Sequence, residues 1–313
     1  MTFRKLSNAA ARDIVRYHRS LLADTVRTET YRNAIDETVR GGDVVADIGC
    51  GSGVLSFFAA RAGAKRVYAI DDGPVIELAR VLAHDNGLAD RITFINASSF
   101  DVTLDDKVDV ILTETMGNNG LDEQIVRAVD DARRRWLRDG GAIIPQSIQT
   151  IAAPADVILD DASFWLEPRY GFDFARTRGY AMNIVHAVDI DEDSLIDDGE
   201  VIAEVDLRAA NDGAVRGTGH FHARRDAVVT GIGVWFRAQL TPQFELTNQP
   251  PNDCRSWKQS FLPIASRMRA DRGDEIAIEI QTFDGIEWKW RAATSALRVE
   301  QSTVNGFPFI KPR

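Results

Sequence analysis

Cysteine and histidine are scarce in this sequence. The 313 residues include two cysteines, Cys50 and Cys254, five histidines and no CxxC pair. A disulfide framework or a cysteine zinc site is therefore not indicated, and a reducing, cytoplasmic location is expected. Among the histidines, the spacing of metal ligands occurs in His220 and His222 alone. These two alternate on what we expect to be one face of a strand, as surface or barrel residues, and no metal site is predicted.

Positive charge is also in deficit. The chain carries 37 Lys and Arg residues against 47 Asp and Glu residues, which gives a formal net charge of −10. Binding to a phosphate backbone requires the opposite sign, so the composition argues against a nucleic-acid partner. An acidic surface favours cationic ligands or basic protein partners, unless the charge serves solubility alone.

Long apolar runs are absent as well. No run approaches the roughly 18 residues that a membrane-spanning helix requires, and the first twenty residues lack the apolar centre of a secretion signal. We therefore expect no membrane partner. A composition of 44% hydrophobic and 27% charged residues is instead typical of a globular protein with a buried core.

The spacing of apolar residues changes near Pro145. Before this point, four short apolar runs alternate with segments of helical spacing, which predicts βαβ units and a parallel sheet. We therefore expect an α/β domain over residues 41–146, preceded by a helical segment over residues 1–40. The runs are Val44–Ile48, Arg66–Ile70, Ile92–Ile95 and Val108–Leu112.

After Pro145 the sequence is typical of β structure. Glu275–Phe283 and Ile286–Trp290 both alternate polar and apolar residues, and the Asp284-Gly285 pair between them is a strong hairpin signal. One segment, Ser163–Tyr180, is aromatic and basic and lacks this alternation. The pattern predicts a β domain over residues 147–313 with one non-strand insert.

A glycine-rich turn follows the first predicted strand. Asp47–Gly53 reads DIGCGSG, and Val54 stands where a dinucleotide fingerprint would have its third glycine, which argues against NAD and FAD. Asp71 ends the next strand, where a carboxylate can accept hydrogen bonds from both ribose hydroxyls. Ser98 and Ser99 follow the third strand, at the place where an adenine would lie. The turn is either a cofactor site or, alternatively, purely structural.

Two carboxylates follow the fourth predicted strand. Ligands of open α/β sheets bind beyond the carboxyl ends of the strands, and Glu114 occupies that position. Gly117 and Gly120 allow the loop to fold back, so we expect Glu123 to face Glu114. A guanidinium suits two such carboxylates, because it is planar, always charged and offers forked donors. The alternative for Glu123 is an acid at a helix N-terminus, where the helix dipole favours it.

Together these features resemble the protein arginine methyltransferases, a family of class I S-adenosylmethionine-dependent enzymes, over most of the chain. Val26–Asn33 (VRTETYRN) is similar to the family's VRTxxYRN segment, and Glu114 and Glu123 match the two acids of its double-Glu loop. Tyr170–Asp173 resembles part of the family's dimerisation arm. The resemblance implies a Rossmann-like domain, a β-barrel domain, a helical dimerisation arm near residues 160–182, and a homodimer.

The resemblance also implies roles for individual residues. Arg27 takes the position of the arginine that binds the methionine carboxylate of the cofactor, S-adenosyl-L-methionine. Glu114 and Glu123 take the catalytic positions. The residues expected to bind the cofactor are His18, Arg27, Asp47, Gly49, Gly51, Asp71, Ser99 and Glu114.

The sequence departs from the family pattern on the acceptor side. Thr115 stands in place of a tryptophan, and Asn118–Gly120 replace aromatic residues. In the loop that resembles the family's THW motif, Ser256 replaces the histidine and Arg255 precedes it. Arg255 either pairs with the carboxylate of a free amino acid or is a solvated loop charge. The N-terminal YFxxY motif is absent, with Asn8, Ala9 and Arg12 in its place, and the residues expected to bind the acceptor are Met116, Arg255, Ser256 and Trp257.

These departures lead us to expect an N-methyltransferase for free L-arginine or a small guanidino compound, in a bacterial natural-product pathway. The alternative is a protein arginine N-methyltransferase acting on peptide-linked arginine. A non-enzymatic alternative is a scaffold protein that retains S-adenosylmethionine binding without turnover.

Overall fold

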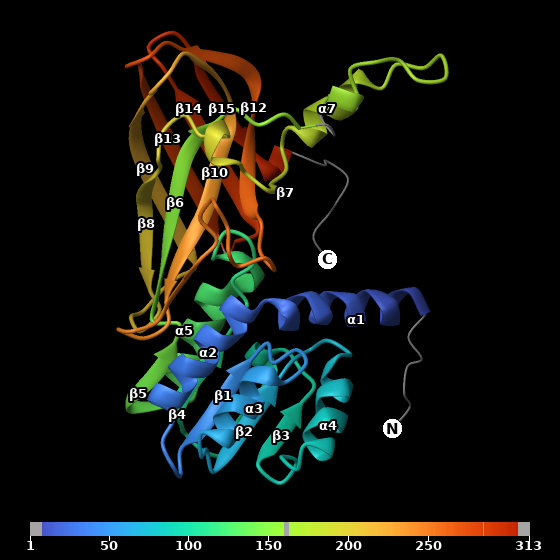
Figure 1. Cartoon of the computed structure of the whole chain (residues 1–313), viewed down its shortest axis with the longest axis vertical. Coiled ribbons are helices and arrows are strands. Elements are labelled where there is room, and N and C mark those ends of the chain that lie inside the picture. Colours follow the sequence, from blue (N-terminus) through green and yellow to red (C-terminus); the bar gives the residue numbers. More distant parts are fainter. Residues whose placement is uncertain (1–7, 160–162, 284, 306–313) are drawn as a thin grey trace.

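The computed structural model describes residues 8–159, 163–283 and 285–305. Two parts are stacked along the long axis of the molecule, an α/β part and a β part, with helix α1 lying beside the junction (Figure 1). No helix within these ranges combines the length and the apolar character that a bilayer crossing requires.

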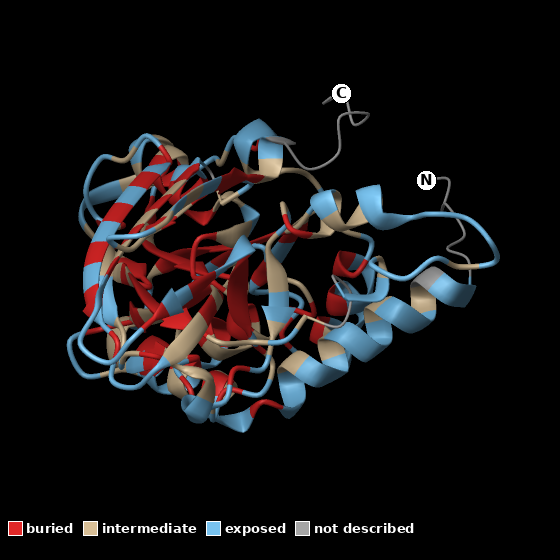
Figure 2. Ribbon diagram, turned by 90° about the horizontal axis from the view of Figure 1, so that it is seen from above, coloured by how far each residue is buried: buried red, intermediate tan, exposed pale blue. Residues whose placement is uncertain are grey.

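Two helices precede the first sheet. They are α1 (Asn8–Ala23) and α2 (Thr25–Thr38). Asp24 caps α2, since its side chain accepts a hydrogen bond from the backbone N–H of Arg27. Helix α2 buries Tyr31, whose hydroxyl donates to the carbonyl of Thr113 over 2.9 Å. Helix α1 is mostly exposed (Figure 2), whereas α2 is anchored to the α/β core.

The first sheet is parallel, as the alternation of strands and helices predicts. Its strands are β1 (Val44–Ile48), β2 (Arg66–Ile70), β3 (Ile92–Ile95), β4 (Val108–Thr113) and β5 (Leu137–Ile144). They lie in the order β3-β2-β1-β4-β5, and every neighbouring pair is parallel. The order reverses between β1 and β4, the place where open α/β sheets bind ligands. The helices of this part are α3 (Val54–Arg61), α4 (Ile76–Asp85) and α5 (Ile125–Arg135).

The second part consists of two antiparallel sheets. One has the order β7-β12-β10-β6-β8, with β11 paired to β10, and the other has the order β15-β14-β13-β9. The strands are β6 (Ser147–Ala155), β7 (His186–Val188), β8 (Glu200–Asp206), β9 (Ala214–His222), β10 (Ala227–Gln239), β11 (Glu245–Thr247), β12 (Gln259–Ala270), β13 (Glu275–Phe283), β14 (Glu287–Ala293) and β15 (Arg298–Ser302).

The predicted hairpin is present between β13 and β14, which pair from Ala277 with Ala293 to Phe283 with Glu287. Asp284, which belongs to its turn signal, lies outside the described residues. The inward faces of the two sheets bury large side chains such as Phe236 and Trp290, while Trp235 is buried on the other face of its sheet in a separate cluster with Ile151 and Ala153. This buried apolar surface, worth roughly 25 cal/mol per Å2, provides the main stabilisation of the β part.

The aromatic insert projects from the β part between β6 and β7 (Figure 1). It contains the short helix α7 (Ala175–Ala181). The side chains of Phe164, Tyr170 and Phe172 are exposed, with Tyr170 97% exposed. Residues 160–162 of the predicted arm lie outside the described residues.

Candidate active site

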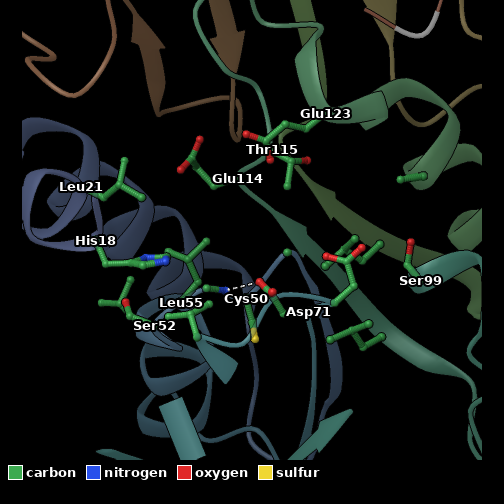
Figure 3. Close-up of a pocket in the computed structure, with 18 of the residues that line it drawn as sticks. His18, Leu21, Cys50, Ser52, Leu55, Asp71, Ser99, Glu114, Thr115 and Glu123 are labelled. Atoms are coloured by element: carbon green, nitrogen blue, oxygen red, sulfur yellow. Dashed lines mark hydrogen bonds between the residues drawn. The ribbon is translucent and has the colours of Figure 1, made fainter. Parts of the chain in front are cut away.

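A cavity of about 470 Å3 opens at the carboxyl ends of β1, β2 and β4. Figure 3 shows its walls: the glycine turn after β1 at its base, Asp71 and Ser99 toward one end, and Glu114 and Glu123 at the other. Helix α1 closes one side with His18 and Leu21. Eight of the residues predicted from the sequence line this cavity: His18, Arg27, Gly49, Gly51, Asp71, Ser99, Glu114 and Glu123.

The glycine turn is fixed by the carboxylate at the end of β2. One oxygen of Asp71 accepts the backbone N–H of Gly51 over 2.8 Å, and the other accepts the N–H of Gly73 over 2.7 Å. Gly51 has φ +52°, and a Cβ there would lie 2.9 Å from the ring of His18. The absence of a side chain at Gly51 thus allows both the turn and the close approach of His18.

Arg27 is buried at the opposite wall, with 5% of its surface exposed. Its guanidinium forms an ion pair with Glu114, donates to the carbonyl of Leu21 over 3.3 Å, and lies over the ring of Trp257 at 5.6 Å. Its Nε is buried and has no hydrogen-bond partner. Burial lowers the pKa of Arg27, which nevertheless stays charged beside Glu114. The unpartnered Nε leaves one donor for an anionic group of a ligand.

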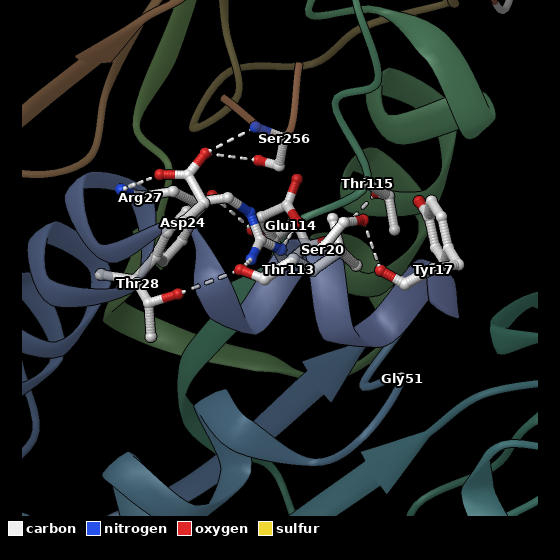
Figure 4. A network of polar contacts seen from close by, with 12 residues as sticks. Tyr17, Ser20, Asp24, Arg27, Thr28, Gly51, Thr113, Glu114, Thr115 and Ser256 are labelled. Atoms are coloured by element: carbon white, nitrogen blue, oxygen red, sulfur yellow. Dashed lines mark hydrogen bonds and ion pairs between the residues drawn. The ribbon is translucent and has the colours of Figure 1, made fainter. Parts of the chain in front are cut away.

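Asp24 joins the two parts of the molecule at this wall (Figure 4). Besides capping α2 through Arg27 N at 3.0 Å, its carboxylate accepts the N–H of Ser256 at 2.8 Å and the hydroxyl of Ser256 at 2.6 Å. Sequence reasoning missed this residue. An Asp directly before a helical segment is an N-cap signal, which predicts that Asp24 caps α2. The contact with Ser256, 232 positions away, has no local signal.

The loop after β4 brings the two glutamates to the same end of the cavity, as the sequence predicts. Asp122 holds the loop in its folded-back form, because its oxygens accept the N–H of Asn118 and the side-chain amide of Asn119. Gly120 has φ +82°, and a Cβ there would lie 2.7 Å from Phe236. The loop can therefore pack this closely against β10 only with glycine at that position.

Glu114 and Glu123 differ in their surroundings. The side chain of Glu114 is 8% exposed and forms an ion pair with the buried guanidinium of Arg27. Glu123 lies at the exposed rim with φ 56°. Its pKa is raised, first by removal of the carboxyl from water and then by the negative charges of Asp122 and Asp71. Two carboxylates in one cavity, one paired with a buried arginine and one with a raised pKa, match a cation clamp with a proton acceptor.

Five predicted site residues lie outside the cavity lining. Asp47 is fully buried under the turn, where its carboxylate accepts the hydroxyl of Ser56 over 2.6 Å and burial raises its pKa to about 7. Met116 is fully buried, because the folded-back loop turns it into the core. Arg255 is exposed, and Ser256 and Trp257 contact Asp24 and Arg27 rather than the cavity.

Tyr17 also lines the cavity, although sequence reasoning did not assign it to the site, and so does Thr115, which the sequence placed on the acceptor side. Tyr17, His18 and Leu21 share one face of α1, which the spacing of positions i, i+1 and i+4 on a helix indicates. That signal becomes usable only once His18 is known to face a ligand.

Comparisons with known proteins identify the family of the chain. Residues 27–153 match the family model for ribosomal protein L11 methyltransferase, and residues 150–291 match the arginine methyltransferase oligomerization subdomain. Protein arginine N-methyltransferase 1 of Saccharomyces cerevisiae is 31% identical over 275 residues, which cover 84% of this chain and 79% of the relative. Probable protein arginine N-methyltransferase 6 of Arabidopsis thaliana is 33% identical over 236 residues, 72% of this chain and 54% of that relative.

Solved structures share the fold. The Trypanosoma brucei PRMT1 enzyme-prozyme complex with AdoHcy has a TM-score of 0.80 at 22% identity, covering 91% of this chain and 96% of its own. Arabidopsis thaliana protein arginine methyltransferase 10 has a TM-score of 0.78 at 22% identity, covering 93% and 99%. The chain belongs to the S-adenosylmethionine-dependent protein arginine N-methyltransferase family.

Proposed function

We propose that this chain transfers a methyl group from S-adenosylmethionine to a guanidine nitrogen of arginine within a protein substrate. The observation that carries the proposal is that Glu114 and Glu123 line the same cavity as the glycine turn and Asp71. The site thereby combines groups suited to an adenosyl cofactor with groups suited to a guanidinium.

The residues present fit the cofactor. Asp71 retains lone pairs for the ribose hydroxyls, because each of its oxygens accepts one backbone N–H. Ser99 lies at the adenine end. The orphaned Nε of Arg27 suits the methionine carboxylate, and a Cβ at Gly51 would fill the cradle beneath His18. When bound, S-adenosylmethionine supplies an electrophilic methyl group on a sulfonium.

The chemistry required of the protein is alignment and proton acceptance. Glu114 and Glu123 grip the guanidinium and direct one nitrogen toward the methyl carbon at near-attack distance. Bound S-adenosylmethionine would supply its methyl group to that nitrogen, and the electron pair of the broken S–C bond would remain on sulfur. The nitrogen then loses a proton, which Glu123 accepts, since its raised pKa makes it a better proton acceptor than an ordinary carboxylate.

A protein substrate is favoured over free arginine. The relatives reported above are named protein arginine N-methyltransferases. The expectation of a free amino acid in a natural-product pathway depended in part on Arg255 as a partner for the substrate carboxylate, and Arg255 is exposed and is not among the residues that line the cavity. The net charge of −10 suits a basic protein partner.

We extend the proposal to the organisation of the chain. Residues 41–146 serve as the cofactor domain behind the helical segment 1–40, and residues 147–313 serve as the β domain. The exposed aromatic side chains of the insert near residues 160–182 form the contact of a homodimer, because an exposed apolar patch of this kind is typical of an interface. The match of residues 150–291 to an oligomerization subdomain supports this assignment.

The proposal is tested with Glu114→Gln, which removes the charge and keeps the shape. We expect methyl transfer to an arginine-rich peptide to fall by about 100- to 1,000-fold, the usual effect of removing one electrostatic group from a transition state. Cofactor affinity by calorimetry is expected to change little. The matched control is Glu77→Gln, on the exposed surface of α4. Unchanged turnover in Glu114→Gln would refute the clamp, and loss of both properties would mean that Glu114 serves the cofactor alone.

A further inference from the structure

The acceptor end of the cavity lacks an aromatic wall from its own loop. Residues 117–120 read Gly-Asn-Asn-Gly, and the loop residues that line the cavity, Glu114, Thr115, Glu123 and Gln124, include no aromatic side chain. A guanidinium bound by carboxylates offers its edges to them, and its flat faces remain uncovered. An aromatic ring is the group best suited to cover such a face.

Helix α1 carries a ring to this end. Tyr17 lines the cavity from the exposed side of α1, and Figure 4 shows it beside Thr115, at the other end of the network from Arg27. Phe100 also lines the cavity, but it follows Ser98 and Ser99 at the adenine end. Among the described residues, Tyr17 is therefore the phenol or phenyl ring that lines the acceptor end.

The position of Tyr17 is set by its neighbour. Its ring makes an edge-on contact with the ring of His18, with centroids 5.3 Å apart and planes at 77°. His18 in turn rests on Gly51, so the two rings extend from the cofactor turn toward the rim. Tyr17 is 55% exposed, so one face of its ring is available to a ligand.

The electrostatic surroundings agree with this placement. The pKa of Tyr17 is raised by burial and by the charge of Glu123, while the charge of Arg27 opposes the rise. The phenol therefore lies within electrostatic range of Glu123, stays neutral and keeps its electron-rich ring faces. A cation held between Glu114 and Glu123 would lie beside that ring.

We propose that Tyr17 is a specificity-determining residue that covers the face of the acceptor guanidinium and the adjoining methylene groups while the two glutamates hold its edges. The proposal rests on the proposed function above. It assigns the aromatic wall of the acceptor site to the N-terminal helix rather than to the loop after β4.

The test compares Tyr17→Ala, Tyr17→Phe and the control Val15→Ala, an exposed position on the same helix that does not line the cavity. The full chain is assayed with S-adenosylmethionine and an arginine-rich peptide, and the cofactor Kd is measured separately. For Tyr17→Ala we expect the peptide KM to rise about 5- to 30-fold, the scale of a partly desolvated cation–π contact, with the cofactor Kd within about twofold of wild type. Tyr17→Phe and Val15→Ala are expected to stay within about twofold.

Three results would overturn this assignment. The first is an unchanged peptide KM in Tyr17→Ala. The second is a cofactor Kd of Tyr17→Ala that rises as much as its peptide KM, which would mean that the ring covers the cofactor. The third is a Tyr17→Phe variant as impaired as Tyr17→Ala, which would mean that the hydroxyl acts and not the ring. Failure of the proposed function looks different, because the wild-type chain would then methylate no peptide.

Discussion

Asp24 offers the sharpest test of how the two parts of the molecule are joined. It is 4% exposed, caps α2 through the N–H of Arg27, and accepts two hydrogen bonds from Ser256 of the β part. Asp24→Ala removes all three interactions and leaves the N–H of Ser256 without its partner. Asp24→Asn can retain the cap, but its amide then faces the N–H of Ser256, so the contact between the parts is weakened alone.

The magnitudes follow from these contacts. Loss of an N-cap costs about 1 kcal/mol, and a hydrogen bond to a charged group contributes about 1.5–3 kcal/mol. We therefore expect the free energy of unfolding to fall by roughly 4–7 kcal/mol for Asp24→Ala, which loses the cap and both bonds to Ser256, and by about 1.5–3 kcal/mol for Asp24→Asn, which loses the bond from the N–H of Ser256. The group that Asp24 caps is the backbone N–H of Arg27. Loss of the cap therefore also loosens Arg27, so cofactor affinity should fall with Asp24→Ala as well.

Denaturant unfolding and calorimetry measure both effects, with Ser256→Ala as the partner variant. Ser256→Ala removes the hydroxyl bond and keeps the backbone bond, so its effect should be the smaller one. In the double variant the two losses should not add, with a coupling of about 0.5–3 kcal/mol. If the losses in free energy of unfolding are fully additive, or if Asp24→Ala is as stable as wild type, the contact between Asp24 and Ser256 does not contribute to stability.

Two further predictions concern buried charges. Arg27→Ala should raise the cofactor Kd about 10- to 150-fold, equivalent to a charge-assisted hydrogen bond of about 1.5–3 kcal/mol, and an unaltered Kd by calorimetry would remove Arg27 from the cofactor site. Burial raises the pKa of Asp47 to about 7. The folded state therefore holds a proton that the unfolded state releases near pH 4. The free energy of unfolding should consequently fall by roughly 2–4 kcal/mol as the pH rises from 4 to 8. Asp47→Asn should lose this dependence, and equal pH slopes in the two proteins would contradict the assignment.

The parallel sheet and its ligand end could be predicted from the sequence because their signals are local. Apolar runs mark the strands. Because the strands are parallel, their carboxyl ends meet at one edge of the sheet, and Asp71 and Glu114 follow two of these ends. The β13–β14 hairpin has the same kind of signal, with alternation on both sides of a turn pair. The family resemblance added Arg27 and His18, and both line the cavity.

The acceptor side could not be predicted in this way, because its geometry depends on contacts between distant segments. Met116 is buried since the Asp122 hydrogen bonds turn its loop inward. Ser256 was expected to face the acceptor but is held by Asp24 from another part of the chain. Tyr17 enters the cavity only because α1 lies across the glycine turn.

The central claim is methyl transfer to protein-bound arginine, and product analysis tests it most directly. The full chain is incubated with methyl-labelled S-adenosylmethionine and either an arginine-rich peptide or free L-arginine, and products are identified by mass fragmentation. We predict a labelled methyl group on a guanidine nitrogen of the peptide, with Glu114→Gln inactive. Label on free arginine alone would contradict the protein substrate, and label on neither acceptor would contradict the methyltransferase assignment itself.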